Sequence, residues 1–285
     1  MKALEVIRIA RAAVRSKLAT GPLPTAPNHD VGNWLDVIRR DGVCVLPEYY
    51  SSETCAELAS AFEQLVERCP AAVRSSSDEA EQRIYGIDNA IGDFGAFSNN
   101  PTFLELAGGI LGTGATNVFT LGNKITSQDG NLGSGGGWHR DSFFNQFKAL
   151  VYLTDVTETS GPFEYILGSH RLARKFGDAI RLNVPLDTAR VPDAIAEACI
   201  RMQPENHRVF TASRGTVVVF DATGIHRGRP LTDGMRMALT NYYYPRRDVS
   251  QKLIDHFSPV LGHHVPLPPD SGAESETGSM KATNG

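Results

Sequence analysis

The sequence predicts an α+β fold, with helices in the N-terminal half and an antiparallel β-sandwich or barrel in the C-terminal half. Two observations support this prediction. Apolar residues recur at helical spacing up to about residue 112, and from about residue 115 short β-rich runs alternate with glycine-rich turns. The 285 residues contain no internal repeat and are enough to bury one sizeable core. We therefore expect a single α+β domain.

The N-terminal residues 1–20 have an amphipathic pattern, with apolar side chains on one helical face and a cluster of arginine and lysine on another. This pattern is typical of a helix that packs on a domain. A mitochondrial presequence or a membrane-surface helix would share it. Residues 21–30 are rich in proline and are expected to form a linker to the domain, which we place at residues 31–265.

Residues 31–69 predict a helix, a strand and a second helix. The helical period runs to residue 40, Asp41 and Gly42 form a turn, and the apolar run at residues 43–46 is typical of a short strand. Ser51 suits the start of the longer helix. Residues 71–100 are polar and irregular, so we expect a loop there that could cover a site, followed by a short helix at 101–112.

The β-rich part of the chain contains five runs that are typical of strands. A basic, partly helical insertion at residues 171–208 interrupts them. Residues 266–285 are rich in proline, glycine and serine without periodicity, and are expected to form a disordered tail. The five runs are NVFTLGNKIT, FKALVYLTDV, FEYILGS, GTVVVFDA and RMALTNYYYP.

Net charge, hydropathy and cysteine spacing disfavour several functional classes. The net charge of −4 disfavours a nucleic-acid-binding protein. No apolar run approaches the roughly 20 residues of a membrane span, and no secretory signal is visible, so we expect a cytoplasmic location, with organellar import through residues 1–20 as the alternative. The four cysteines form no CxxC pair, which disfavours a zinc ribbon or a disulfide framework. The oligomeric state stays open.

The strongest chemical pattern is a set of three metal-ligand side chains. His139 and Asp141 are two residues apart, so on a strand both would point to the same face. His226 follows a strongly apolar strand and a turn, and would come from another strand of the same barrel. Two histidines and one carboxylate on one face form the facial triad of non-haem Fe(II) oxygenases. The vacant positions of such a site can take a bidentate 2-oxo acid and dioxygen.

Arg236 lies ten residues beyond His226, on the next predicted strand. A guanidinium group is permanently charged and can hold a carboxylate by two parallel hydrogen bonds. It would therefore orient the distal carboxylate of a 2-oxo diacid that chelates the metal.

These residues together resemble the phytanoyl-CoA dioxygenase family. The resemblance rests on the HxD pair, the following apolar strand, Ser160-Gly161-Pro162 leading to the Leu-Gly-Ser-His turn at 167–170, and the later histidine and arginine. It covers about residues 31–250 and is sharpest over 120–245. It implies a double-stranded β-helix (a jelly-roll, cupin-like barrel) with flanking N-terminal helices. It also implies that His139, Asp141 and His226 bind iron and that Arg236 anchors 2-oxoglutarate.

The resemblance implies an Fe(II)- and 2-oxoglutarate-dependent dioxygenase that consumes O2 and releases succinate and CO2. Since related halogenases lack the carboxylate ligand, Asp141 favours hydroxylation. We expect a small-molecule substrate, with biosynthetic tailoring of a metabolite as the leading interpretation. The alternatives are an acyl-CoA 2-hydroxylase of the phytanoyl-CoA type, a non-catalytic cupin-like binding protein and a cupin enzyme that does not use 2-oxoglutarate. A C-terminal peroxisomal tripeptide is not visible, which disfavours the acyl-CoA interpretation.

Further residues are expected at the co-substrate site. Lys148, Leu150 and Tyr152 occupy every second position on the strand after the HxD pair and would face the barrel interior, although Lys148 could instead be salt-bridged. Gly228 stands where the family often has a hydroxyl residue, so Thr240 or Thr126 is expected to supply that contact. The remaining expectations are a cavity-facing Lys124, a lid that includes Arg83 and Tyr85, a structural His170, a packed Trp138 and an Arg140 on the opposite face.

Overall fold

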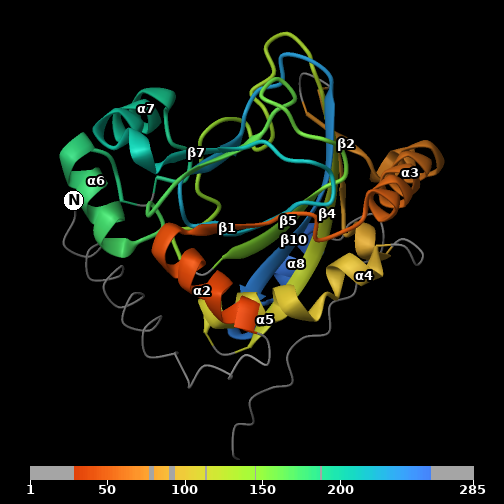
Figure 1. Cartoon of the computed structure of the whole chain (residues 1–285), viewed down its shortest axis with the longest axis horizontal. Helices are drawn as coiled ribbons and strands as arrows, with labels where there is room; N and C mark the ends of the chain where they lie inside the picture. The colour runs from red at the N-terminus through yellow and green to blue at the C-terminus, as the bar shows by residue number, and fades with distance from the viewer. Residues whose placement is uncertain are drawn as a thin grey trace, which may run out of the picture.

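The computed structural model describes residues 29–76, 80–89, 94–112, 114–144, 146–186 and 188–257. Two antiparallel sheets of seven and three strands face each other (Figure 1), which confirms the predicted α+β double-stranded β-helix with flanking helices. The expected helix at residues 1–20 and the expected tail at 266–285 lie outside the described residues.

The larger sheet has the strand order β1-β8-β5-β10-β4-β3-β2, and the smaller sheet has the order β7-β6-β9. All five β-rich runs of the sequence belong to these sheets. The strands of the larger sheet are β1 (Val43–Leu46), β2 (Arg74–Ser75), β3 (Glu81–Tyr85), β4 (Ala115–Thr126), β5 (Phe147–Tyr152), β8 (Val217–Asp221) and β10 (Met235–Pro245). Those of the smaller sheet are β6 (Phe163–Ile166), β7 (His207–Phe210) and β9 (His226–Gly228).

Side chains of the larger sheet alternate between a helix-covered face and a face toward the smaller sheet. On β8, Val217 and Val219 join the core beneath the helices, whereas Val218 and Phe220 point to the smaller sheet. There Phe220 packs on Phe163 of β6, with the ring centroids 4.6 Å apart. The apolar run of β8 is therefore buried on both faces, and the space between the two sheets is where the predicted ligands meet.

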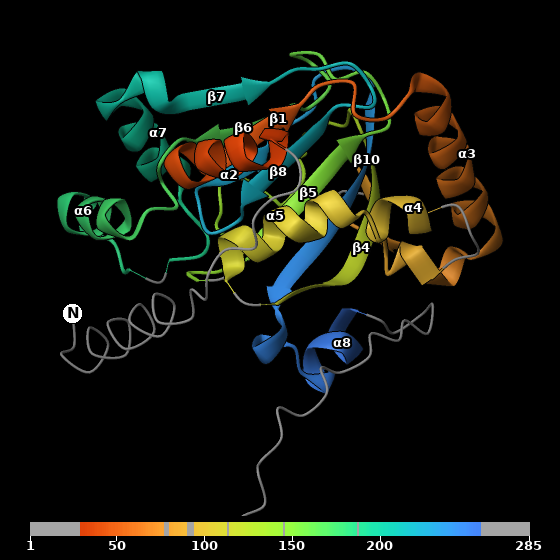
Figure 2. The same ribbon diagram turned by 60° about the horizontal axis from the view of Figure 1, so that its bottom comes forward.

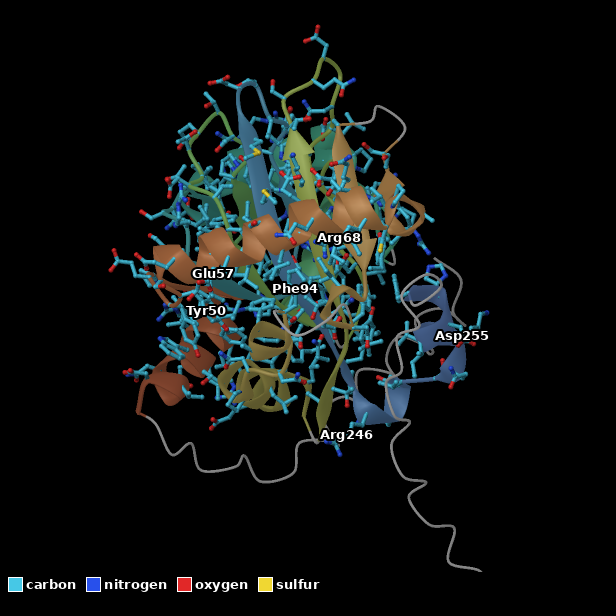
Figure 3. The ribbon with its side chains drawn as sticks, turned by 90° about the vertical axis from the view of Figure 1, so that its right-hand side faces the viewer. Tyr50, Glu57, Arg68, Phe94, Arg246 and Asp255 are labelled. Atoms are coloured by element: carbon cyan, nitrogen blue, oxygen red, sulfur yellow. The ribbon has the colours of Figure 1, made fainter. Side chains whose placement is uncertain are left out.

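Four helices cover the outer face of the larger sheet (Figure 2): α2 (His29–Asp41), α3 (Ser52–Arg68), α4 (Gly95–Ser98) and α5 (Pro101–Leu111). Their starts follow from local chemistry. The Ser51 hydroxyl accepts a hydrogen bond from the Thr54 amide, and Asn100 caps α5 ahead of a proline at its first position. Figure 3 shows α3, with Glu57 and Arg68, across the near side of the molecule.

The remaining helices flank the barrel. The predicted insertion at 171–208 contains α6 (Leu172–Leu182) and α7 (Asp193–Met202), which lie beside the smaller sheet, and α8 (Gln251–Phe257) follows the last strand (Figures 1 and 2). Short 3-10 helices are η1 (Pro70–Ala72), η2 (Ile87–Asn89), η3 (Pro204–Asn206) and η4 (Arg246–Asp248). No helix among the described residues is long and apolar enough to cross a membrane.

The expectation of an irregular loop over residues 71–100 is wrong for its middle part. Residues Glu81–Tyr85 form β3, which pairs with β4 in the larger sheet, so that Arg83 lies opposite Asn123. The sequence does not predict this strand because its inward side chains are polar, so no apolar alternation is visible. Glu81 is nevertheless 2% exposed, since its carboxylate accepts hydrogen bonds from Asn123 and Ser134 at 2.9 Å each.

Candidate active site

The three predicted ligands converge because two distant chain segments pair through their backbones. The His139 amide donates to the His226 carbonyl at 2.9 Å, and the His226 amide donates to the His139 carbonyl at 3.0 Å. Directly paired residues carry their side chains on the same face, and the two imidazole centroids lie 4.4 Å apart. Asp141 is fixed in turn by its amide, which donates to the Ala222 carbonyl at 3.0 Å.

The ligand atoms fit a single metal ion. His226 Nε2 lies 3.4 Å and His139 Nε2 lies 3.8 Å from the Asp141 carboxylate, and one ligand atom of each residue lies within 4.8 Å of the others. The Nδ1 atoms of His139 and His226 are hydrogen-bonded to the carbonyls of Gly137 at 2.8 Å and Gly224 at 3.0 Å. In the neutral rings these bonds place the proton on Nδ1 and leave Nε2 free as a ligand. Neighbouring ligands of a six-coordinate ion lie about 3 Å apart, so a small inward movement of the three side chains would bring these atoms to that spacing.

A glycine-rich turn leads into the first ligand segment. Gly135 has a φ of +86°, and a Cβ there would lie 2.3 Å from Cε1 of His139. Both the left-handed backbone and the close approach require glycine at this position. The turn therefore packs directly on the imidazole ring and fixes its orientation.

Lys148 of β5 is the cationic neighbour of the ligands. Its Nζ lies 2.6 Å from Asp141 Oδ2 and 4.1 Å from the centroid of the Tyr242 ring, and the residue is 5% exposed. Burial alone would raise the pKa of Asp141, but the charge of Lys148 and the interactions with both histidines outweigh it and hold the pKa well below its usual range. Burial and the neighbouring His226 lower the pKa of His139 to about 3. Asp141 is therefore held as a carboxylate and His139 as a neutral imidazole, which are the forms that bind a metal.

Arg236 of β10 lies in the same cavity and is 2% exposed. Its Nη1 donates to the Gly161 carbonyl, its Nε has no hydrogen-bond partner, and no described carboxylate forms an ion pair with it. Burial lowers its pKa, which Tyr152 and Glu81 only partly offset. A Cβ at Gly228 would lie 3.1 Å from two of its nitrogens, so glycine there makes room for the guanidinium. An uncompensated buried guanidinium fits an anionic ligand such as the 2-oxoglutarate carboxylate.

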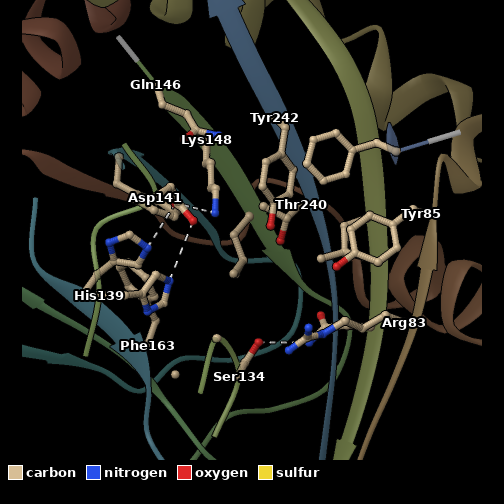
Figure 4. Close-up of a pocket in the computed structure, with 18 of the residues that line it drawn as sticks. Arg83, Tyr85, Ser134, His139, Asp141, Gln146, Lys148, Phe163, Thr240 and Tyr242 are labelled. Atoms are coloured by element: carbon tan, nitrogen blue, oxygen red, sulfur yellow. Dashed lines mark hydrogen bonds and ion pairs between the residues drawn. The ribbon is translucent and has the colours of Figure 1, made fainter. Parts of the chain in front are cut away.

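The cavity between the two sheets has a volume of about 280 Å³. Figure 4 shows His139 and Asp141 on one side of it and Tyr85, Tyr242 and Arg83 on the other. The predicted residues that line it are His139, Asp141, His226, Arg236, Lys148 and Thr240, together with Arg83 and Tyr85 of the expected lid. Arg83 and Tyr85 lie on strand β3 rather than on a loop.

The predicted positions of Lys124 and Thr126 at the cavity are wrong. Strand β10 faces the cavity with Arg236, whose partner on β4 is Ile125, so the even-numbered residues at this end of β4 face outward. Lys124 Nζ pairs with Glu63 of α3 at 2.7 Å, and the Thr126 hydroxyl lies 3.4 Å from the Ala80 carbonyl. Thr240 therefore stays the candidate for the second co-substrate contact.

The predicted cofactor-binding role of Tyr152 is also not supported by its position. The side chain faces the barrel interior as expected, but it lies in the apolar cluster between the sheets and does not line the cavity. Its hydroxyl donates to the Phe210 carbonyl at 3.1 Å and accepts from the Phe163 amide at 3.1 Å. These bonds hold the two sheets together.

Arg140, Trp138 and His170 lie as predicted, outside the cavity. Arg140 points away from the cavity and donates to the carbonyls of Ser169 at 2.7 Å and Thr223 at 2.6 Å. Trp138 is buried beneath the Arg227 guanidinium, which lies 4.4 Å from its ring centroid. The His170 ring is hydrogen-bonded to the Arg39 carbonyl at 3.1 Å.

Sequence reasoning missed several residues that line the cavity. Asn123 and Ser134 were hidden because their positions depend on the pairing of β3 with β4. Arg190 comes from the loop between α6 and α7, whose place beside His139 no local pattern indicates. The other missed lining residues are Leu121, Gly135, Gln146, Phe163, Phe220, Tyr242, Tyr244 and Phe257. Of these, the three consecutive tyrosines at 242–244 are visible in the sequence as an aromatic run, six residues after Arg236 on the same strand.

Known proteins match both the sequence and the fold. Ectoine dioxygenase of Bordetella bronchiseptica is 26% identical over 208 residues, which cover 66% of this chain and 66% of that protein. The structure of EctD from S. alaskensis with bound Fe has a TM-score of 0.61 at 19% identity, covering 80% of this chain and 81% of that one. The epimerase SnoN in complex with Fe3+, alpha ketoglutarate and nogalamycin RO has a TM-score of 0.57 at 16% identity, covering 76% and 84%.

The family model for phytanoyl-CoA dioxygenase (PhyH) matches residues 38–238, a span that includes all three predicted metal ligands and Arg236. The resemblance seen in the sequence is thereby confirmed. The chain belongs to the phytanoyl-CoA dioxygenase family.

Proposed function

We propose that the protein is an Fe(II)- and 2-oxoglutarate-dependent oxygenase that hydroxylates a small metabolite. One observation carries the proposal: two imidazole nitrogens and a carboxylate converge in the same cavity as a buried guanidinium that has no carboxylate partner among the described residues. Family membership supports it. Bound iron, with 2-oxoglutarate and O2, would supply the oxidising chemistry and release succinate and CO2.

His139, Asp141 and His226 would hold the iron and leave its remaining positions to the co-substrates. Lys148 would hold Asp141 in its ionised form and fix its orientation, because its ammonium group already lies 2.6 Å from the carboxylate. The backbone hydrogen bonds of both rings would keep Nε2 directed at the metal. These residues prepare the site before the iron binds.

Arg236 would bind the distal carboxylate of 2-oxoglutarate, and the Thr240 hydroxyl is the proposed second contact. The two lie on the same face of β10, four residues apart, and both line the cavity. Leu150, Phe163 and Phe220 complete the lining between the sheets and would exclude water from the reacting atoms.

The substrate class follows from the size of the cavity. A volume of about 280 Å³ must hold the co-substrate and the reacting part of the substrate. Cavities for drug-sized ligands measure about 300–1,000 Å³, so this one suits a small metabolite. We therefore propose tailoring of a small metabolite.

The test measures succinate formed from 2-oxoglutarate in air by the iron-loaded protein, with a panel of metabolites. We expect stimulated turnover with at least one compound and none in Asp141→Ala. Succinate formation at the same rate in Asp141→Ala would exclude this site as its source. Binding of iron and 2-oxoglutarate without turnover across a broad panel would favour a non-catalytic binding protein.

A further inference from the structure

We propose that the substrate is a small organic anion with an apolar body, and that Arg190 binds its anionic group. This inference rests on the proposed function, because it names the substrate of the same site. It is carried by the position of Arg190, by the excess of positive over negative side chains around the cavity and by the aromatic wall opposite the metal ligands.

The backbone holds Arg190 beside the first metal ligand. The Arg140 amide donates to the Ala189 carbonyl at 2.8 Å, and the Val191 amide donates to the Trp138 carbonyl at 2.9 Å. These two bonds flank an antiparallel bridge between His139 and Arg190. Directly opposed residues share a face, so the arginine side chain enters the cavity on the side of the ligands.

The Arg190 guanidinium has capacity to bind an anion. It is exposed and donates through Nη1 to the Gly135 carbonyl, and no described carboxylate forms an ion pair with it. Gly136 leaves space next to it, because even an added Cβ would lie 3.7 Å from Nη1. A guanidinium with free donors in a cavity is suited to bidentate binding of a carboxylate or phosphate group.

The charges that line the cavity are mostly positive. Among the described lining residues, Asp141 is the only acid, whereas Arg83, Lys148, Arg190 and Arg236 are cations. Arg83 is neutralised by Glu81 behind the wall. Iron with Asp141 and dianionic 2-oxoglutarate would carry one negative charge, which Arg236 offsets. Lys148 and Arg190 then leave a net positive cavity, which attracts an anion and disfavours a cation.

The wall opposite the ligands is aromatic. Tyr85, Tyr242, Tyr244 and Phe257 line it, and Figure 4 shows Tyr85 and Tyr242 across the cavity from His139 and Asp141. The Phe257 ring is nearly parallel to that of Tyr85, with centroids 5.7 Å apart and an interplanar angle of 25°. Phe119 stacks in turn on Phe257 and on Tyr242, with ring centroids 4.2 Å apart in each pair, so the wall presents an apolar aromatic surface that favours an apolar substrate body.

The test uses four probes of similar shape: 3-phenylpropionate, 2-phenylethylphosphonate, 3-phenylpropanamide and 3-phenylpropylamine. Each is titrated by calorimetry into protein loaded anaerobically with Fe(II) and saturating 2-oxoglutarate, and also into the metal-free protein. We expect at least one anionic probe to bind about tenfold more tightly than the amide or the amine. Which anion binds more tightly shows whether the group is a carboxylate or a phosphonate-like oxyanion.

Two variants assign the effect to one residue. Arg190→Gln is expected to reduce anion affinity about tenfold and leave amide affinity unchanged, and Arg190→Lys to restore part of the loss. Arg201→Gln is the matched control, since Arg201 is exposed on α7 and pairs with Glu197 away from the cavity. Equal binding of all four probes, no binding of any, or an unchanged anion preference in Arg190→Gln would overturn the inference.

Failure of this inference can be told apart from failure of the proposed function. Binding of 2-oxoglutarate itself, and its loss in Arg236→Gln, reports on the function and does not involve Arg190. Normal 2-oxoglutarate binding without anion preference would overturn only the substrate class. Absence of 2-oxoglutarate binding would contradict the function, and the titrations of the metal-free protein would still report on Arg190.

Discussion

Replacing Arg236 with methionine should separate folding from co-substrate binding. The guanidinium is 2% exposed and lacks a carboxylate partner among the described residues, so the fold bears the cost of burying a charge. Its loss removes one hydrogen bond, to the Gly161 carbonyl, worth about 1 kcal/mol. Removal of the buried charge offsets that loss. We expect the Tm of the metal-free protein to fall by no more than about 4 °C, or to rise.

The affinity for 2-oxoglutarate should change far more. Truncation of one partner in a buried, hydrogen-bonded charge pair costs about 2–5 kcal/mol, or roughly 30-fold to a few thousand-fold in Kd. Because Arg236 is almost fully buried, solvent screens this interaction little. We expect a loss of at least about 100-fold in Arg236→Met, measured by calorimetry under anaerobic conditions with Fe(II) bound.

The opposite pattern would refute this reasoning. If Arg236→Met lowered the Tm by more than about 10 °C and left 2-oxoglutarate affinity within about threefold of the original, the arginine would be a structural residue. Arg140→Met is the matched control, because Arg140 is also buried but donates two hydrogen bonds to the carbonyls of Ser169 and Thr223. That variant should lower the Tm, since two buried carbonyls lose their donor.

Three further predictions follow from the site. His139 has its pKa lowered to about 3 from 6.5 by burial and by His226, so between those values the unfolded chain binds a proton that the folded protein does not. The metal-free protein should therefore lose about 2 kcal/mol of stability between pH 7.5 and 5 by urea unfolding, and His139→Gln should lose less; an equal loss would contradict the assignment. Gly135→Ala should abolish tight iron binding, because its Cβ would displace the His139 ring; an unchanged iron Kd would show that the turn does not orient the ligand. Lys124→Ala should leave 2-oxoglutarate affinity within about twofold, whereas Thr240→Val should weaken it about fivefold or more; the reverse order would restore Lys124 as a co-substrate residue.

The convergence of the three proposed metal ligands could be predicted from the sequence because each depends on a local relation. His139 and Asp141 share a face through the two-residue period of extended chain, and His226 follows an unmistakable apolar strand. The family resemblance then joined the two segments, and the backbone pairing of the two histidines explains why they meet. Arg236 was predictable for the same reason, since it begins the next strand of the barrel.

The predictions were wrong where the direction of a side chain depends on pairing with a strand that is distant in the sequence. Lys124 lies one residue from Asn123, which does line the cavity, and only the pairing of β4 with β10 decides which of the two points inward. Strand β3 was not predicted because its sequence is polar. Glu81 and Arg83 form an ion pair inside the fold, which allows this polar segment to be a strand of the sheet. Arg190 reaches the site from a loop that follows α6, a position no periodicity encodes.

Anaerobic titration of the iron-loaded protein with 2-oxoglutarate, followed by visible absorption, tests the central claim most directly. It needs no substrate and reports on the metal and the co-substrate together. The structure predicts a weak charge-transfer band that saturates with equimolar 2-oxoglutarate and requires a far higher concentration in Arg236→Met. Tight iron binding with no band at saturating 2-oxoglutarate would contradict the claim that these residues form a 2-oxoglutarate-dependent oxygenase site.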